Sequence, residues 1–388
     1  FLTNLRTRIV VIKMNVPKLR FNEFNTEWNE IKLSDYCTII TKGTTPSKFY
    51  NSGIRFIKIE SLNNHYIDNS KCLYIDDKTH FGNLKRSILF ENDILFAIAG
   101  ATVGKCGIVR KINLPANTNQ ALSIIRLKNS INPLFVLNCL DSYNMRKYIF
   151  LNVAIGAQPN LNLEQIANFR FKIPSKIEQD KIINLINLLD KKIELQLKKI
   201  EALKLYKKGL LYQEYNKLYN FGNLLELGKL AKIYQPHTIS SNLCNNGDFF
   251  VFGANGIIGK YSKYNHENEQ ITISCRGEYA GTVNLTPKKC WINGNSMVIN
   301  IDNSMIIEKD YLRYILESQN LKYLISGSGQ PQIIRSDVMK HKIPIIKYEK
   351  QTDFYTKFVL LDKKLNFEYK YLNKLQQLKK GLMQNMFV

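Results

Sequence analysis

The segment Glu178–Gln213 reads EQDKIINLINLLDKKIELQLKKIEALKLYKKGLLYQ, and a second copy of it lies near the C-terminus. That copy, Lys350–Phe387, reads KQTDFYTKFVLLDKKLNFEYKYLNKLQQLKKGLMQNMF. The two align without gaps, so that Leu189-Asp190-Lys191-Lys192 matches Leu361-Asp362-Lys363-Lys364 at an offset of 172 residues. A chain that repeats a long element once, with a large block of different sequence before each copy, is built in two halves.

Each copy has the a/d pattern of a coiled coil, with steps of four and three residues sustained over about four heptads. The two seams comprise Ile182, Ile186, Leu189, Ile193, Gln196, Ile200, Leu203, Lys207 and Leu210, and Phe354, Phe358, Leu361, Leu365, Glu368, Leu372, Leu375, Lys379 and Leu382. The polar exceptions occupy matching positions, which predicts that the two helices pair with each other. The alternative is two separate amphipathic helices, each packed on its own domain; it would leave part of each narrow seam in water.

The composition favours a nucleic-acid partner. The 388 residues include 55 Lys+Arg and 32 Asp+Glu, a net charge of +23. Such an excess indicates an anionic partner, with nucleic acid ahead of an acidic membrane surface. An AT-rich genome would raise the lysine content but would not by itself deplete acidic residues. The length predicts two or three domains, and no segment approaches the ~18 apolar residues that would span a bilayer.

Cysteine and histidine usage predicts neither disulfides nor a zinc site. Seven cysteines are scattered without any C-x-x-C pair, as expected of reduced thiols in a cytosol. The five histidines have no ligand spacing relative to them. We expect His65, His80, His237, His266 and His341 to be ordinary surface or turn residues. Residues 1–13 are treated as an N-terminal extension of uncertain status, because they are short for a signal peptide and Met14 is the expected natural start.

The sequence before the first long helix, residues 14–175, has the pattern of an α+β domain. Short β-branched runs bounded by turn residues predict strands, and a helix follows at Pro133–Leu151. The predicted strands include Cys37–Lys42, Ile54–Ile59, Ser87–Phe90, Ile94–Ala99, Lys105–Val109 and Leu122–Leu127. Because the strands do not alternate with helices, we expect a twisted mixed sheet and not a βαβ array. The first long helix is expected over residues 176–216.

The second half, residues 217–346, repeats this order and ends in a long helix over 347–388. Its predicted strands include Phe249–Phe252, Ile271–Cys275 and Met297–Ile301, followed by a helix near Lys309–Leu324. Both halves then contain a Gln-Pro loop and an Ile-Pro stop before the long helix. The loops and stops are Gln158-Pro159, Gln330-Pro331, Ile173-Pro174 and Ile343-Pro344. The domains differ in sequence while these connections agree, which favours two different targets read from one shared frame.

Catalytic motifs are weak. Gly100–Lys105 resembles a phosphate loop but has one residue too few between its glycines and Cys106 after the lysine, so a strand turn is predicted. Gly253–Gly259 is predicted to be a hairpin turn. Asn132–Phe135 is one residue away from the Asn-Pro-Pro-Phe loop of adenine methyltransferases. Without a glycine-rich cofactor motif, it is better interpreted as a helix start with Pro133 in the first turn. No catalytic or metal-ligating constellation stands out.

Basic residues interleave with aromatic and small polar residues in several predicted loops, as DNA-binding surfaces require. Lysines supply phosphate contacts, whereas Arg, Asn, Gln and Thr can read base edges. The alternative for each loop is a solvated basic turn. The candidate DNA-binding residues are Lys42, Thr44, Thr45, Ser47, Lys48, Tyr50, Lys105, Lys260, Tyr261, Lys263, Tyr264 and Arg276.

The duplicated order of these motifs resembles the specificity (S) subunit of type I restriction–modification systems, from Met14 onward. Besides the paired Leu-Asp-Lys-Lys helices, the Gln-Pro loops and the Ile-Pro stops, the resemblance rests on Val16–Phe21 with Trp28 and on the Lys42–Pro46 turn. No single motif is specific, but their duplicated order is.

The resemblance implies a non-catalytic subunit in the cytoplasm. Two target-recognition domains would each bind half of a bipartite, asymmetric site in double-stranded DNA. The long helices would form an antiparallel coiled coil that sets the spacing and docks two methyltransferase subunits, joined by two restriction subunits in the full complex. S-adenosylmethionine, ATP and Mg would be bound by those partners, and none by this chain. The alternatives are the recognition half of a fused restriction–methylation enzyme, a coiled-coil scaffold that binds proteins, or an RNA-binding protein.

Overall fold

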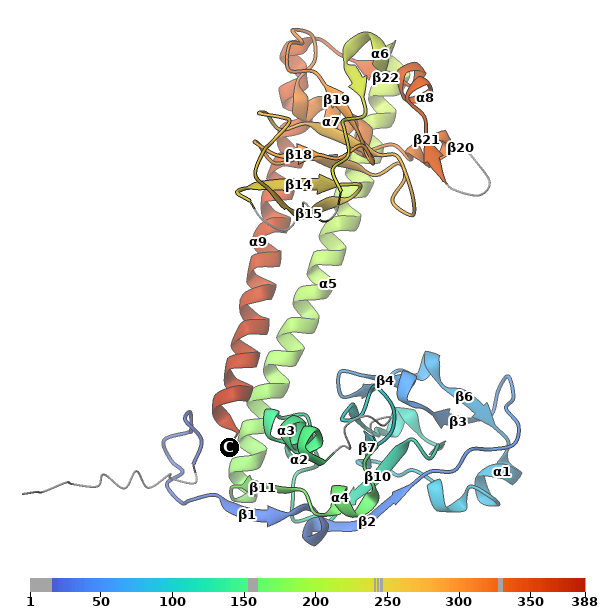
Figure 1. Ribbon diagram of the computed structural model, residues 1–388, viewed down its shortest axis with the longest axis vertical. Coiled ribbons are helices and arrows are strands. Elements are labelled where there is room, and N and C mark those ends of the chain that lie inside the picture. Colours follow the sequence, from blue (N-terminus) through green and yellow to red (C-terminus); the bar gives the residue numbers. More distant parts are fainter. Residues whose placement is uncertain are drawn as a thin grey trace, which may run out of the picture. The chain divides into compact units, whose positions relative to one another are not determined.

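The computed structural model describes residues 16–152, 160–240, 242, 244, 247–326 and 331–387 (Figure 1). Residues 1–13, Gln158-Pro159 and Gln330 of the predicted motifs lie outside the described residues. The chain divides into two compact units. Unit 1 comprises Phe1–Glu194 and Asn373–Val388, and unit 2 comprises Leu195–Leu372. Each unit contains one globular head and a stretch of both long helices, and both heads have the predicted α+β character.

The head of unit 1 is built on a four-stranded sheet of order β2-β10-β7-β8. A three-stranded sheet, β6-β3-β9, and the pairs β1-β11 and β4-β5 complete it. Its strands are β1 (Asn29–Lys32), β2 (Cys37–Lys42), β3 (Ile54–Ile57), β4 (Leu62–Asn63), β5 (Tyr66–Ile67), β6 (Leu73–Ile75), β7 (Ile94–Ala97), β8 (Cys106–Ile108), β9 (Ala116–Thr118), β10 (Leu122–Leu127) and β11 (Arg170–Ile173). Its short helices are α1 (Asp77–Phe81), α2 (Pro133–Leu140), α3 (Tyr143–Asn152) and α4 (Leu163–Ala167).

The head of unit 2 contains the sheets β13-β19-β16-β17 and β15-β14-β18, with the pairs β12-β22 and β20-β21. Its strands are β12 (Asn223–Glu226), β13 (Lys232–Tyr234), β14 (Phe249–Gly253), β15 (Gly256–Tyr261), β16 (Ile271–Ser274), β17 (Val283–Leu285), β18 (Trp291–Ile292), β19 (Ser296–Asn300), β20 (Ile325–Ser326), β21 (Gln332–Ile333) and β22 (Lys342–Ile345). Its short helices are α6 (Leu227–Leu230), α7 (Lys309–Glu317) and α8 (Arg335–Lys340).

The two heads share one topology, although their sequences differ. In each four-stranded sheet, the strand that comes first in the sequence pairs with the one that comes last. That last strand also pairs with the first strand of a hairpin, β7-β8 in unit 1 and β16-β17 in unit 2. In both three-stranded sheets one pairing is parallel, β3 with β9 and β14 with β18. Strands β11 and β22, which precede the long helices, pair antiparallel with β1 and β12. The internal repeat predicted from the helices therefore extends through the heads.

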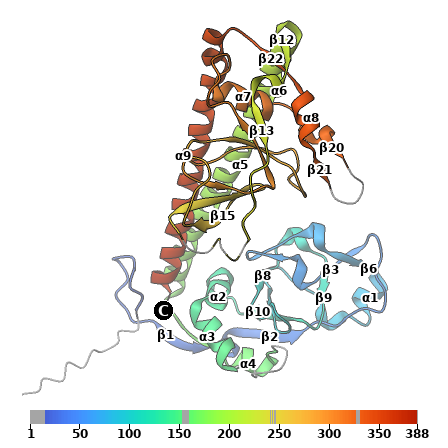
Figure 2. The ribbon, with the colours of Figure 1, turned by 45° about the horizontal axis from the view of Figure 1, so that its top comes forward.

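The long helices are α5 (Lys176–Phe221) and α9 (Tyr348–Met386), and they lie side by side (Figures 1 and 2). Within unit 1, Lys379 Nζ donates to Asp190 Oδ1 at 2.5 Å. Within unit 2, Gln196 Nε2 donates to Glu368 Oε2 at 2.7 Å and Lys207 Nζ to Asp362 Oδ1 at 2.6 Å. Residue numbers rise along α5 as they fall along α9 through these contacts. The helices therefore pair antiparallel within each unit.

The predicted seam residues face inward. All of them are buried or half-buried, while the positions between them along α5 and α9 are largely exposed. One contact to the head also recurs at the start of each long helix. It is made by the buried side-chain amides of Gln179 and Gln351. Gln179 Oε1 accepts from the Asn132 backbone N–H at 2.9 Å, and Gln351 Oε1 accepts from that of Glu308 at 2.7 Å.

Three predicted elements were wrong in detail. The helix predicted over Pro133–Leu151 is two helices, because Asp141 ends α2 and the Ser142 hydroxyl accepts from the Met145 N–H to begin α3. Ser87–Phe90 is not a strand: a 3-10 turn ends at Ser87, and only Ile88 forms a bridge, to Asn117. The helix near Lys309–Leu324 ends at Glu317, and a separate 3-10 turn follows at Leu321–Leu324.

Three of the five histidines are buried, which corrects the expectation that all are ordinary surface or turn residues. His80, His266 and His341 have exposed fractions of 3%, 8% and 8%. Each bonds a polar side chain that comes from elsewhere in the chain: His80 bonds Asn117, His266 bonds Tyr234 and His341 bonds Tyr323. They are core residues of their heads, each held by at least one side-chain hydrogen bond.

Candidate nucleic-acid interface

The first candidate set follows strand β2 in unit 1 and is held against the loop between β9 and β10. The Thr44 backbone N–H donates to Thr118 O at 3.1 Å, and the Thr45 hydroxyl bonds the Gln120 side chain. Gly43 permits this approach, since a Cβ there would lie 1.9 Å from Thr118 O. Lys42, Thr45 and Ser47 remain exposed. The turn is therefore anchored to this loop and presents exposed polar side chains.

Lys48 and Tyr50 extend this surface as a cation on an aromatic ring. Lys48 Nζ lies 5.1 Å from the centre of the Tyr50 ring. The Tyr50 hydroxyl donates to Asp76 Oδ2 at 3.2 Å, and this hydrogen bond raises the pKa of Tyr50. An aromatic face with a lysine above it suits a sugar–phosphate chain, since the ring packs against the sugar and the ammonium meets the phosphate.

The structure adds Arg86 to this surface. Arg86 is exposed, and its Nη2 donates to Thr44 Oγ1 at 3.3 Å. The two residues are 42 positions apart in the sequence and come together because the sheets fold the 3-10 turn at Lys85–Ser87 toward the β2 end. No local pattern signals this proximity. The only hint in the sequence is the Lys85-Arg86 pair itself.

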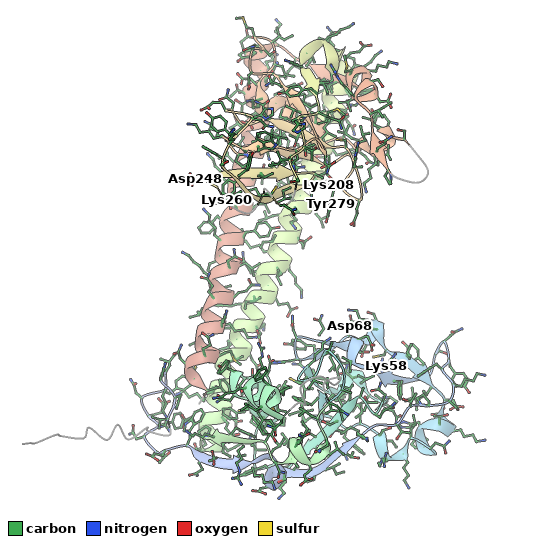
Figure 3. All side chains as sticks on the ribbon, viewed as in Figure 1. Lys58, Asp68, Lys208, Asp248, Lys260 and Tyr279 are labelled. Carbon is green, nitrogen blue, oxygen red and sulfur yellow. The ribbon has the colours of Figure 1, made fainter. Side chains whose placement is uncertain are left out.

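The second candidate set lies on the edge strand β15 and the loop after it, in unit 2. Lys260 Nζ lies over the Phe250 ring at 5.5 Å, and Lys260 is labelled in Figure 3. Tyr261 packs edge-on against Trp291, while Lys263 is exposed. Tyr264 is 40% exposed, and hydrogen bonding to Glu267 raises its pKa. Since β15 corresponds to β6 and not to β2, the two candidate sets occupy non-equivalent parts of their heads.

The structural counterpart of the Lys42–Ser47 turn is the segment after β13, which the sequence did not single out. There, Gln235 Nε2 donates to Gly294 O at 3.2 Å, and the Gly294 N–H donates to Thr238 Oγ1 at 3.0 Å. Gln235 and Thr238 are exposed. The resemblance between GTTPS and QPHT is too slight to identify this turn without the strand order.

The remaining two candidates lie at hairpins of the four-stranded sheets. Lys105 lies just before β8 and is half-buried, and its Nζ donates to Ile59 O at 3.2 Å, so part of its hydrogen-bonding capacity is used within the fold. Arg276 follows β16 and is exposed. Gly253–Gly259 and Gly100–Lys105 both form hairpin connections, as predicted, between β14 and β15 and between β7 and β8.

The described part of the chain contains no group of three or more His, Cys, Asp or Glu residues that could hold a metal ion, and no helix in it is long and apolar enough to cross a membrane. All seven cysteines are free thiols. Burial raises the pKa of the thiols of Cys72, Cys106, Cys139, Cys275 and Cys290, which disfavours the reactive thiolate.

Both long helices expose large apolar side chains on the surface away from their seam. Leu188 and Leu360, which are equivalent in the repeat, are 62% and 59% exposed. Leu195 and Phe367, the next equivalent pair, are 55% and 67% exposed. These apolar residues recur at matched positions of the repeat and lie outside its buried seam.

Residues 25–205 and 221–380 match the family described as "Type I restriction modification DNA specificity domain", one copy in each half of the chain. This protein therefore belongs to the type I restriction modification DNA specificity domain family. The resemblance found in the sequence is confirmed.

Individual relatives agree with the family assignment. The chain is 29% identical over 147 residues to the type I restriction enzyme EcoBI specificity subunit of Escherichia coli, a match that covers 37% of this chain and only 30% of that relative. Its fold is similar to the type I restriction–modification S subunit from M. genitalium, with a TM-score of 0.58 and 19% identity over 96% of this chain and 99% of that one. A chain from a study of complex assembly and conformational transition in the type I R-M system is similar at a TM-score of 0.59 and 14% identity, over 92% and 96%. At these identities the structures show the fold alone.

Proposed function

We propose that this chain is the sequence-specificity subunit of a type I restriction–modification complex, which recognises a bipartite, asymmetric site in double-stranded DNA and positions two methyltransferase subunits and two restriction subunits. The observation that carries the proposal is the duplication of a whole head, with its helix, while the exposed loops of the two copies differ. Two heads with the same topology can each bind DNA. Because their exposed loops differ, each head would recognise a different half-site.

The net charge of +23 supports DNA as the ligand. The surface of Lys42, Lys48 and Arg86 in unit 1, and that of Lys260 and Lys263 in unit 2, would contact phosphates. Exposed Thr, Gln and Arg side chains beside them would contact base edges. RNA would also satisfy the charge, but two heads on a paired-helix frame suit two half-sites of one duplex better.

The paired helices would act as the spacer between the half-sites, in the form of an antiparallel coiled coil. Helix α5 has 46 residues, which corresponds to about 69 Å at ~1.5 Å per residue. Half-sites one DNA turn apart are separated by ~34 Å. The helix is therefore long enough to serve two heads bound one turn or somewhat more apart.

The methyltransferase subunits would dock on the exposed apolar residues of the helices. Leu188 with Leu195 and Leu360 with Phe367 provide the same apolar pair twice, so two copies of one partner could bind in the same way. The proposal leaves the chemistry to the partners, which would bind S-adenosylmethionine, ATP and Mg in the cytoplasm. A fused restriction–methylation enzyme would need an Asn-Pro-Pro-Phe-type motif in this chain, and Asn132–Phe135 instead begins α2, with Asn132 as its cap.

The direct test uses the purified chain alone and together with its methyltransferase partner. We expect no methyl transfer by the chain alone, and sequence-specific binding and methylation by the complex. Methyl transfer by the chain alone would contradict the proposal. Replacing Leu360 and Phe367 with serine should remove one of the two methyltransferase subunits from the complex, while Ile258→Ser, which changes an equally exposed apolar residue on β15, should not.

A second test separates DNA recognition from a protein scaffold. Lys42→Gln with Lys48→Gln should weaken DNA binding by the complex, whereas Lys147→Gln, which removes an exposed lysine from α3, serves as the matched control. A coiled-coil scaffold without a DNA function predicts that none of these variants changes target preference.

A further inference from the structure

The two heads contain the same hairpin turn, although the sequences of the turns share only their glycines. The turn between β7 and β8 runs from Gly100 to Gly104, and the turn between β16 and β17 runs from Gly277 to Gly281. All four glycines have positive φ, at +82° and +93° in the first turn and +74° and +88° in the second. An L side chain is strained in this conformation. The matching backbone shows that the turns are structural equivalents.

Each turn begins beside the segment that follows the Gln-Pro region of its own half. Ala99 forms an antiparallel bridge with Asn160, and Arg276 forms one with Gln332. The hydrogen bonds that hold the bridges also match, because the Leu161 N–H donates to Ile98 O at 2.8 Å and the Ile333 N–H donates to Cys275 O at 2.9 Å. Asn160 and Gln332 are separated by the same 172 residues as the helix copies.

The bridges place two polar side chains next to each other at one exposed edge of the unit 2 head. Residues directly opposite in an antiparallel bridge have Cβ atoms about 4.5–5.5 Å apart and point to the same face. Arg276 and Gln332 are both exposed. The Arg276 side chain forms no hydrogen bond or ion pair with any residue that the structure describes. In contrast, Arg126 is held by Asp93 in a two-pronged ion pair.

An unpaired guanidinium beside a primary amide has the chemistry of base recognition. Arginine donates two hydrogen bonds to the O6 and N7 of guanine, and glutamine or asparagine pairs in the same two-pronged way with the N6 and N7 of adenine. Tyr279, in the same turn and labelled in Figure 3, is 50% exposed and could pack against the adjoining sugar.

We propose that Arg276 and Gln332 are the base-reading pair of the unit 2 head, with Arg276 contacting a guanine and Gln332 an adjacent adenine. The equivalent pair, Ala99 and Asn160, reads the other half-site, where Asn160 contacts an adenine and the Ala99 methyl group can meet the thymine methyl. This inference rests on the proposed function and adds to it the positions that determine specificity. It also gives the Gly100–Gly104 turn a function as the support of one reading edge.

The test replaces the gene in its source strain with variants and determines the methylated motif by single-molecule sequencing of methylated adenines. The wild-type gene should produce one bipartite motif. Arg276→Ala and Arg276→Lys should each relax a single guanine position in one half-site by roughly 5- to 150-fold, because lysine keeps the charge but lacks the fork. Gln332→Ala should relax a neighbouring position, and Asn160→Ala a position in the other half-site. Lys288→Ala, which removes an exposed charge from the same head, should leave the motif unchanged.

The outcomes separate the two proposals. An unchanged motif with both Arg276 variants would overturn the base-reading pair and leave the proposed function intact, whereas the absence of any motif that depends on the wild-type gene would overturn the proposed function itself. If a variant strain shows no methylation, its purified complex with the methyltransferase is bound to duplexes that differ at one base pair each. Retained discrimination at every position would then refute the pair, and lost discrimination at one position would support it.

Discussion

Acidification should destabilise unit 2 through His341. Its imidazole is 8% exposed, its Nδ1 bonds the Tyr323 hydroxyl at 2.5 Å, and its Nε2 has no hydrogen-bond partner among the described residues. Burial lowers the pKa of His341 to about 4, compared with 6.5 for an unperturbed histidine. The folded unit therefore holds this histidine neutral. The unfolded chain takes up a proton at a higher pH.

The sign and size of the effect follow from proton linkage. Between about pH 6.5 and pH 4 the unfolded state binds more protons at this site than the folded state, so the free energy of unfolding falls as the pH falls. For these two pKa values the loss between pH 7 and pH 4.5 is about 2 kcal/mol. Burial also lowers the pKa of His266 in the same unit, which adds a loss of the same sign.

Urea unfolding at a series of pH values measures this loss. The chain has two tryptophans, Trp28 in unit 1 and Trp291 in unit 2, so a Trp28→Phe background makes fluorescence a reporter of unit 2. His341→Gln should remove most of the pH dependence attributed to His341, while His237→Gln, at an exposed histidine, should leave it unchanged. Equal slopes for His341→Gln and the parent protein between pH 7 and pH 4.5 would refute the reasoning.

Three further predictions concern the helices and the charge. Asp362→Ala should lower the free energy of unfolding in urea by about 2–3 kcal/mol, because the Asp362 carboxylate accepts hydrogen bonds from Lys207, Arg313 and Tyr314. Its repeat equivalent, Asp190→Ala, should lower it by less than about 1 kcal/mol, because Asp190 is bonded by one lysine. Equal losses for the two variants would contradict this reasoning. Phe358→Ala, at a fully buried seam position, should lower the free energy of unfolding by about 3–5 kcal/mol. A similar loss on replacing an exposed helix residue would contradict the assignment of the seam as the buried face. DNA affinity of the complex should fall steeply with salt, and a log–log slope near zero in a titration would exclude phosphate contacts.

The long helices could be predicted from sequence because their information is local. A seam position differs from its neighbours in hydrophobicity, and the period of that difference identifies both the helix and its buried face. Matching polar positions, such as Gln196 and Glu368, then identified the partner, and these two residues do bond each other. Strands β2 and β10 begin and end at the predicted residues, since both are β-branched runs bounded by turn residues.

Several failures share a physical cause, which is contact between residues far apart in the sequence. Asp141, which ends α2, bonds His65, 76 residues away, at 3.0 Å. The buried histidines could not be recognised because their partners come from other elements. Arg86 joined the candidate surface only through the fold. Periodicity cannot report any of these contacts, because it describes one segment at a time.

The long helices and their contacts to the heads are similar in the two halves, whereas the exposed loops of the heads differ. This difference explains why the DNA-binding residues were harder to predict from sequence than the helices. Positions that hold the frame together, such as Gln179 and Gln351, are the same residue in both copies because both must satisfy the same backbone groups. Positions at equivalent hairpin edges, such as the half-buried Ala99 and the exposed Arg276, differ between the copies. If these edges contact DNA, two unlike half-sites require them to differ. A search for residues shared by the two halves therefore identifies the long helices and their contacts, but not the positions proposed to contact bases. Those positions are identified by the matching backbone of the two hairpins.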